Sequence, residues 1–131
     1  MNADHSLAAN PFAEHLALQV ESAADGRCRM ALQVVPSHLN PHGVVHGAVL
    51  FALADTAMGH ALYTRLARGQ SCTTIEIKIN FLAAVRAGRI VCASEVLRAG
   101  RSVAYLEARL HADARLLATA SGHFALRAPR A

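Results

Sequence analysis

The chain has 131 residues, of which 53% are hydrophobic and 17% are charged. This length accommodates one domain over residues 1–131, and the composition excludes a largely disordered chain. Thirteen lysines and arginines against nine aspartates and glutamates give a net charge of +4, a moderate excess that suits an anionic ligand such as a phosphorylated cofactor. Because the arginines are dispersed and aromatic residues make up only 5% of the chain, we expect no nucleic-acid partner.

No apolar segment predicts a membrane span, which needs about 20 residues. The longest one, 48–63, is interrupted by Asp55, Gly59 and His60. The N-terminal residues lack the apolar core of a signal peptide, so we expect a cytoplasmic protein without a membrane partner. Three cysteines cannot all pair with one another and predict small buried side chains: Cys28, Cys72 and Cys92.

The first third of the chain predicts a short helix and a hairpin. Asn10 and Pro11 are typical of a helix start, and residues 16–21 then alternate between apolar and polar as a half-buried strand does. Asp25-Gly26 predicts a hairpin turn, and the alternation continues over 28–34. The prolines and glycines of 36–47 predict a loop.

Residues 48–66 are apolar around nearly the whole circumference of a helix, which predicts a helix enclosed on most sides. Four alternating segments follow and predict strands: 73–81, 90–97, 102–111 and 116–126. This order of elements predicts an α+β fold in which an antiparallel sheet curls around one central helix. Because one small sheet cannot enclose a helix alone, we also expect a dimer.

The alternation in the segment 73–81 assigns its side chains to two faces. Thr73 falls in phase with the apolar positions Ile75, Ile77, Ile79 and Phe81. Thr74 falls in phase with the polar positions Glu76, Lys78 and Asn80. We therefore expect these two threonines on opposite faces of the sheet.

Asp55 is the only charged residue between His46 and Arg65 if histidines are taken as neutral. A carboxylate in such apolar surroundings is hydrogen-bonded, has a raised pKa or takes part in chemistry. The structural alternative is an aspartate that bonds a nearby backbone amide or Thr56. The sequence favours a functional carboxylate.

Gly47 stands at the predicted start of the central helix, where its amide is an unpaired donor at the positive end of the helix dipole. A glycine lets a substrate carbonyl approach the backbone closely, as an oxyanion hole requires. The eight residues from Gly47 to Asp55 span about 12 Å, too far for both to serve one carbonyl. If two central helices pack antiparallel across a dimer, Asp55 of one protomer lies opposite Gly47 of its partner.

Three histidines at intervals of four residues, His38, His42 and His46, invite a metal-binding interpretation. A proline and a glycine between them break the helix that would align their rings, so we expect no metal. We interpret His46 as a brace that holds Gly47, and His60 as an interior or interface histidine. No Ser-His-Asp arrangement, phosphate loop or dinucleotide motif occurs.

Taken together, these residues resemble the hotdog-fold acyl-CoA thioesterases, and specifically the phenylacetate-degradation (PaaI-like) branch. The resemblance covers about residues 35 to 125 and rests on five segments: Asn40-x-x-Gly43-x-x-His46-Gly47, Leu53–Ala57, Ile75–Leu82, Arg98–Ser102 and Leu117–Phe124. The family usually has a second glycine where this chain has Ala48. Asp55, where other branches use glutamate, favours the PaaI-like branch.

The resemblance implies an acyl-CoA thioesterase that hydrolyses a thioester to a carboxylic acid and free CoA, with no cofactor besides the CoA of the substrate. It implies Asp55 as the catalytic carboxylate, acting as general base or nucleophile, and Gly47 as the donor to the thioester carbonyl. Asn40 and His46 would shape the loop. It implies that the Thr74 hydroxyl orients the attacking water, or that Thr73 does so in its place. It also implies that Arg98, Arg101 and Ser102 bind the CoA phosphates.

Two alternatives remain open. A hotdog enoyl-CoA hydratase is disfavoured because His38 stands where its motif places an aspartate. A non-catalytic acyl-CoA binding or sensing protein would keep Asp55 as a structural residue. The sequence does not fix the acyl specificity or separate a dimer from a dimer of dimers, that is, a homotetramer.

Overall fold

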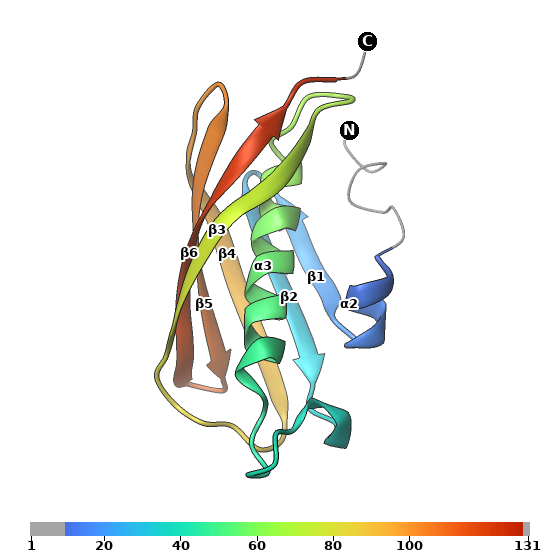
Figure 1. Cartoon of the computed structure of the whole chain (residues 1–131), viewed down its shortest axis with the longest axis vertical. Coiled ribbons are helices and arrows are strands. Elements are labelled where there is room, and N and C mark those ends of the chain that lie inside the picture. The colour runs from blue at the N-terminus through green and yellow to red at the C-terminus, as the bar shows by residue number, and fades with distance from the viewer. Residues whose placement is uncertain (1–9, 130–131) are drawn as a thin grey trace.

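The computed structural model describes residues 10–129 (Figure 1). Its helices and strands, with a single 3-10 turn η1, occur in this order: α2 (Pro11–His15), β1 (Gln19–Ala24), β2 (Arg27–Gln33), η1 (Pro36–His38), α3 (Gly47–Tyr63), β3 (Ser71–Phe81), β4 (Arg89–Ala99), β5 (Val103–Ala112) and β6 (Arg115–Arg127). No helix in the part described is long and apolar enough to cross a membrane.

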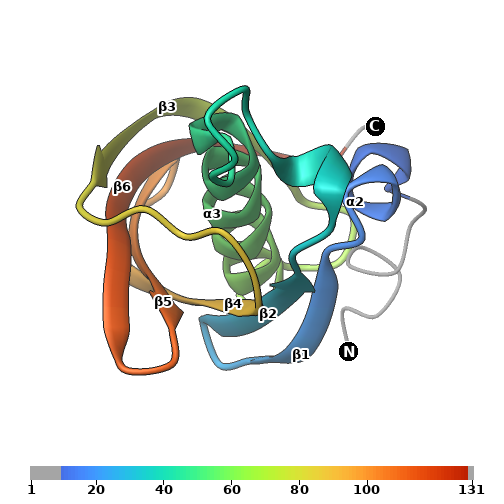
Figure 2. The same cartoon turned by 90° about the horizontal axis from the view of Figure 1, so that it is seen from below.

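The six strands form one antiparallel sheet in the order β1-β2-β4-β5-β6-β3. Figure 2 shows that this sheet curls around α3, which lies in its concave side. Because β3 follows the helix and pairs with β6, the chain crosses from the β1–β2 side of the sheet to its opposite edge between β2 and β3. The expected α+β hotdog arrangement is confirmed.

The core lies between α3 and the concave face of the sheet. Leu53, Met58 and Leu62 are fully buried there, together with Phe124 and Leu106 from the strands. The helix begins one residue earlier than predicted and ends three residues earlier, at Tyr63.

A stripe along the helix stays open within one protomer, in keeping with the expectation that one small sheet cannot enclose the helix alone. The stripe comprises eight residues that are exposed or half-buried: Gly47, Ala48, Phe51, Asp55, Thr56, Gly59, His60 and Tyr63. The protomer's own sheet therefore covers only part of α3.

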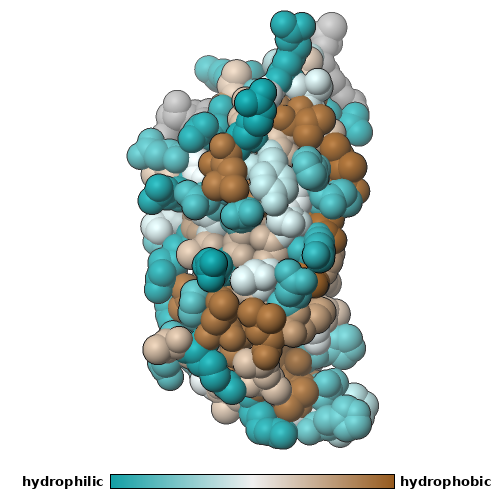
Figure 3. Space-filling view, turned by 90° about the vertical axis from the view of Figure 1, so that its left-hand side faces the viewer, coloured by the Kyte–Doolittle hydropathy of each residue, from teal (hydrophilic) through white to brown (hydrophobic). Residues whose placement is uncertain are grey.

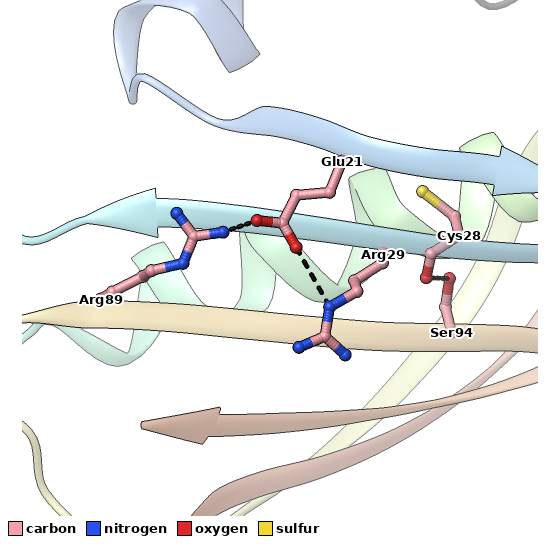
Figure 4. Close-up of polar contacts among 5 residues, drawn as sticks. All are labelled: Glu21, Cys28, Arg29, Arg89 and Ser94. Carbon is pink, nitrogen blue, oxygen red and sulfur yellow. Dashed lines mark hydrogen bonds and ion pairs between the residues drawn. The ribbon is translucent and has the colours of Figure 1, made fainter. Parts of the chain in front are cut away.

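A buried hydroxyl fixes α3 to the sheet. Ser94 on β4 donates a hydrogen bond to the carbonyl oxygen of Ala57 at 2.8 Å, and its oxygen lies 3.2 Å from the carbonyl oxygen of Cys28 on β2 (Figure 4). Because an unpaired hydroxyl in this core would be costly, these bonds select one position of the helix along the strands. Ala57 is two residues from Asp55, so the same contact fixes the position of the Asp55 carboxylate along the strands.

The first strand of the N-terminal hairpin begins later than predicted. β1 begins at Gln19 rather than near Leu16, because α2 is followed by Ala17 with a φ of 60° before the chain extends. The turn is as expected: Asp25 and Gly26 have φ values of 53° and 78°, the left-handed pair typical of a type I′ turn. On the outer face, Glu21 forms ion pairs with Arg29 and Arg89 (Figure 4).

The outer face of the sheet is mostly polar. Seen from the side where β6 lies, the surface is a mosaic of hydrophilic residues with separate apolar clusters (Figure 3). Glu76, Lys78 and Asn80 of β3 belong to this face. There the Glu76 carboxylate accepts one hydrogen bond from the His123 amide and lies 2.9 Å from the His123 ring nitrogen Nδ1. The sheet is therefore covered on one side only, as is common for antiparallel sheets.

Candidate active site

Asp55 lies on the open stripe of α3, with its side chain directed at β3. The hydroxyl of Thr74 donates a hydrogen bond to the Asp55 carboxylate, with 2.8 Å between Oγ1 and Oδ1. Burial raises the pKa of Asp55 above its ordinary value, and the hydrogen bond from Thr74 partly offsets this rise. The result is a half-buried carboxylate of increased basicity that still has access to the surface.

A β-bulge brings Thr74 to this position. The pairing of β3 with β6 shifts between Thr74 and Glu76, so that Ile75 has no partner in the register. The extra residue reverses the alternation: Thr74 shares the concave face with Ile77 and Phe81, whereas Thr73 faces outward and accepts a hydrogen bond from Arg127 at 3.0 Å. The expected phase, with Thr73 beside the apolar positions and Thr74 beside Glu76, is wrong for this reason.

The loop before α3, residues 39–46, which we call the site loop, is held by its own hydrogen bonds. The Asn40 side-chain oxygen accepts from the amides of His42 at 2.9 Å and Val44 at 3.3 Å, and the Asn40 amide donates to the Val44 carbonyl oxygen. Gly43 completes the turn with a φ of 77°, which favours glycine. Asn40 is therefore the residue around which this loop folds.

Two contacts that the sequence did not indicate attach the site loop to the connection between β3 and β4. Arg86 donates hydrogen bonds to the carbonyl oxygens of His42 and Gly43 at 3.2 and 3.3 Å. The Val45 amide donates to the Val85 carbonyl oxygen at 2.8 Å. An arginine that bonds only backbone oxygens leaves no pattern in the sequence, because no specific partner residue is required.

His46 is the N-cap of α3. Its ring nitrogen Nδ1 accepts a hydrogen bond from the Ala48 amide at 2.9 Å, and its own amide donates to the His38 carbonyl oxygen. Within residues 10–129 the Gly47 amide makes no backbone or side-chain hydrogen bond. Gly47 thus carries a free N–H at the positive end of the helix dipole.

Phe81 covers the Gly47 backbone from the β3 side. A Cβ atom added at Gly47 would lie 3.0 Å from the Phe81 ring, so this ring packs directly on the first turn of the helix. An apolar hollow of about 420 Å³ opens beside them, lined by Val45, Gly47, Leu50, Phe81, Leu82, Ala83, Ala84 and Val85. A larger groove of about 790 Å³ lies on the outer face of the sheet and includes neither Gly47 nor Asp55.

The rings of His38 and His46 bond backbone groups. His38 is buried, with its Nδ1 accepting from the Val35 amide at 3.2 Å and its Nε2 lying 3.0 Å from the Leu16 carbonyl oxygen. Because Nδ1 is an acceptor, Nε2 is the donor to Leu16. His38 therefore ties the end of α2 to the site loop, and residues 10–129 contain no cluster of three potential metal ligands.

The far end of the open stripe holds Tyr63, Cys72 and His60, and of these the sequence did not single out Tyr63. Burial raises the pKa of Cys72 to about 11 and also raises the pKa of Tyr63, and their side chains are hydrogen-bonded to each other. Desolvation lowers the pKa of His60. Each of these pKa shifts favours the neutral form of the side chain, and Asp55 is the carboxyl group of this stripe.

Arg98, Arg101 and Ser102 are exposed at the β4–β5 turn, as the sequence suggested. The Ser102 carbonyl oxygen accepts from the Leu126 amide, which places this turn at the end of the sheet where β6 finishes and β3 begins. Thr73 and Arg127 belong to the same end. Arg127 is thus a further cation near the predicted group.

The hydrogen bond from Thr74 predicts a measurable change in the titration of Asp55. Replacing Thr74 by valine removes a donor that stabilises the ionised carboxylate, so the pKa of Asp55 rises above that in the wild type. Thr74→Ser keeps the donor and serves as the control. Carbon-detected NMR titration of the Asp55 carboxyl checks this, and an equal pKa in all three proteins would contradict the described contact.

A family model described as the thioesterase superfamily matches residues 42–119. PA0474 of Pseudomonas aeruginosa, whose name assigns it provisionally to the esterases, is 34% identical over 98 residues, which cover 74% of this chain and 73% of that protein. The 1,4-dihydroxy-2-naphthoyl-CoA hydrolase of Listeria monocytogenes is 25% identical over 97 residues, 74% of this chain and 79% of the hydrolase.

Solved structures of similar fold include further proteins related in sequence. The conserved protein PA5202 of Pseudomonas aeruginosa superposes with a TM-score of 0.88 at 33% identity, over 90% of this chain and 94% of its own. A mutant of the phenylacetic acid degradation protein PaaI from Thermus thermophilus superposes with a TM-score of 0.83 at 28% identity, over 88% of this chain and 98% of its own. With the family match spanning more than half of its residues, the chain belongs to the thioesterase superfamily.

Proposed function

We propose that this protein hydrolyses acyl-CoA thioesters to a carboxylic acid and free CoA, in active sites shared between the two protomers of a homodimer. The observation that carries the proposal is the pair of groups on α3. Asp55 is a half-buried carboxylate of raised pKa, and Gly47 carries a free amide two helical turns away. Each supplies one half of a thioester-hydrolysis site, and their separation of about 12 Å requires a second protomer to complete it.

In the proposed reaction, a water molecule attacks the thioester carbon while Asp55 accepts its proton. The Gly47 amide of the partner protomer donates to the carbonyl oxygen as negative charge develops on it. Collapse of the tetrahedral intermediate breaks the carbon–sulfur bond, and the proton passes to the departing thiolate. The products are the acid and the CoA thiol.

Supporting residues have separate roles in this proposal. Thr74 holds the Asp55 carboxylate and orients the attacking water. Asn40 and His46 keep the site loop and the first turn of α3 in the shape that presents the Gly47 amide. Arg98, Arg101 and Ser102, with Thr73 at the same end of the sheet, bind the CoA phosphates.

The open side of the protomer supports a dimer that places α3 against its copy. Four large apolar side chains are exposed on α3, on β3 and just after it: Phe51 (37%), Ile75 (55%), Phe81 (55%) and Leu82 (57%). β3 has 11 residues and is an edge strand, with unpaired backbone groups along one side. A second copy would cover this apolar surface and pair this edge, either as a dimer or within a dimer of dimers.

The relatives support the same reaction class, since the Listeria protein is named as the hydrolase of a CoA thioester. The test is the release of free thiol from phenylacetyl-, hydroxybenzoyl-, hexanoyl- and decanoyl-CoA. Turnover of at least one of them supports the proposal. Binding of these thioesters without any release would instead indicate the alternative, a non-catalytic acyl-CoA binding protein.

A further inference from the structure

Arg86 lies in the connection between β3 and β4, residues 82–88, and its guanidinium reaches across to the site loop. Its Nη1 atom donates hydrogen bonds to the carbonyl oxygens of His42 at 3.2 Å and Gly43 at 3.3 Å. Arg86 is exposed, yet none of the ion pairs among residues 10–129 includes it. Because holding a long side chain in one conformation costs entropy, these two bonds point to a role in fixing the loop.

The loop tip that Arg86 contacts is bonded from two sides. The Asn40 side-chain oxygen accepts from the amides of His42 and Val44 within the loop. Arg86 donates to the carbonyl oxygens of His42 and Gly43 from outside it. Asn40 therefore sets the shape of the loop, and Arg86 fixes that shape against the β3–β4 connection.

The connection that carries Arg86 is itself held at both ends by hydrogen bonds. The Leu82 amide donates to the Leu117 carbonyl oxygen on β6 at 2.8 Å. The Gly88 carbonyl oxygen accepts from the Val34 amide, just after β2, at 2.8 Å. In Figures 1 and 2 the connection (yellow) and the site loop (teal) lie at the end of the molecule where α3 begins. Arg86 thus fastens the site loop to a fixed part of the fold.

The same contacts define the surroundings of the Gly47 amide. The hollow of about 420 Å³ beside Gly47 lies between the start of α3 with the end of the site loop and the end of β3 with residues 82–85. Arg86 and the hydrogen bond from the Val45 amide to the Val85 carbonyl oxygen join its two sides. Because only three residues separate Gly43 from Gly47, a displaced loop tip also changes the direction of the Gly47 N–H.

We propose that Arg86 is a positioning residue: it holds the site loop against the β3–β4 connection and so fixes the direction in which the Gly47 amide donates. This inference rests on the proposed thioesterase function, in which that amide stabilises negative charge on the thioester carbonyl oxygen. Donors that are aligned before the reaction stabilise the transition state most. Arg86 therefore acts on kcat through Gly47, without contact with the substrate. Asp55 does not depend on Arg86, because Thr74 on β3 holds that carboxylate.

The first test measures thiol release, from the acyl-CoA that the wild type hydrolyses fastest, by Arg86→Met and Arg86→Lys. Methionine keeps most of the side-chain length without a donor, and lysine keeps a cationic donor. We expect kcat to fall about tenfold in Arg86→Met with KM within about twofold of the wild type, and lysine to restore most of the loss. Arg115→Met, at the exposed first residue of β6, is the control and is expected to keep the wild-type rate.

The second test determines whether Arg86 acts through the Gly47 amide. Gly47→Pro has no amide hydrogen at this position, so adding Arg86→Met is expected to lower kcat no further. Asp55→Asn keeps the amide, so adding Arg86→Met is expected to lower the residual kcat by the same factor of about ten. A merely structural role of Arg86 would lower kcat in both backgrounds alike.

Circular dichroism and light scattering check that the variants fold and associate, and Arg86→Gln, which keeps one amide donor group, replaces Arg86→Met if that variant does not fold. Four results would overturn the inference while leaving the thioesterase function intact: an unchanged kcat, a change confined to KM, equal losses in both backgrounds, or no recovery with lysine. Absence of thiol release by the wild type from every thioester would overturn the proposed function, and this inference with it.

Discussion

Replacing Asp55 by asparagine is expected to lower kcat at least about 100-fold, the range that a lost general base produces. The asparagine side-chain oxygen can still accept the hydrogen bond that Thr74 donates to Asp55 at 2.8 Å, so the local geometry is retained. What the variant loses is the basic carboxylate. Thiol release under saturating acyl-CoA measures the effect, and equal rates in both proteins would remove Asp55 from the mechanism.

The same variant has an expected effect on stability, with a sign fixed by the raised pKa of Asp55. A carboxyl whose pKa is higher in the folded state than in the unfolded state costs stability once it ionises. This cost in stability is absent at pH values below the pKa of the carboxyl in the unfolded state. It is complete at pH values above the pKa of the carboxyl in the folded state. At neutral pH, Asp55→Asn is therefore expected to unfold at the same temperature as the wild type or a higher one. A lower midpoint would indicate that the carboxylate is structural.

Gly47→Pro is expected to lower kcat by about 100-fold or more, the effect of losing one oxyanion donor. Proline has no amide hydrogen, and the first helical position accepts it without breaking the helix. Because a Cβ at this position would lie 3.0 Å from the Phe81 ring, crowding has to be separated from loss of the donor.

The matched control for this variant is Gly47→Ala, which adds the Cβ but keeps the amide. We expect Gly47→Ala to retain much more activity than Gly47→Pro on the same thioester. If the two variants lose activity equally, crowding of Phe81 explains the loss, and the amide has no role in the reaction. Circular dichroism and mass measurements confirm that both variants remain folded and associated.

The sequence predicted the elements whose local signals agree with the final packing. The central helix, the turn at Asp25-Gly26 and the alternating strands β4 to β6 were recognisable because their periodicity matches the faces they bury. Asp55 was recognisable for a related reason, since a carboxylate within an apolar helix is costly unless something holds it. The sequence did not reveal that Thr74 holds it.

The errors have physical causes. The bulge at Ile75 reverses the faces of β3, and nothing in the alternation of that strand marks where the extra residue lies. The sequence did not show which face of α3 stays open, because small apolar residues occur on both its buried and its open faces. Arg86 and His38 act on backbone groups, which any sequence supplies. Such contacts become visible only when the segments lie side by side.

The central claim is that Asp55 of one protomer and Gly47 of the other serve one reaction. It is tested most directly by co-expressing Asp55→Asn and Gly47→Pro protomers, which are inactive as homodimers, with two different affinity tags. In the mixed dimer, one site carries both lesions and the other carries neither. The purified mixed dimer is therefore expected to regain about half of the wild-type activity. If each site instead belonged to a single protomer, every site would carry a lesion, and an inactive mixed dimer would contradict the account.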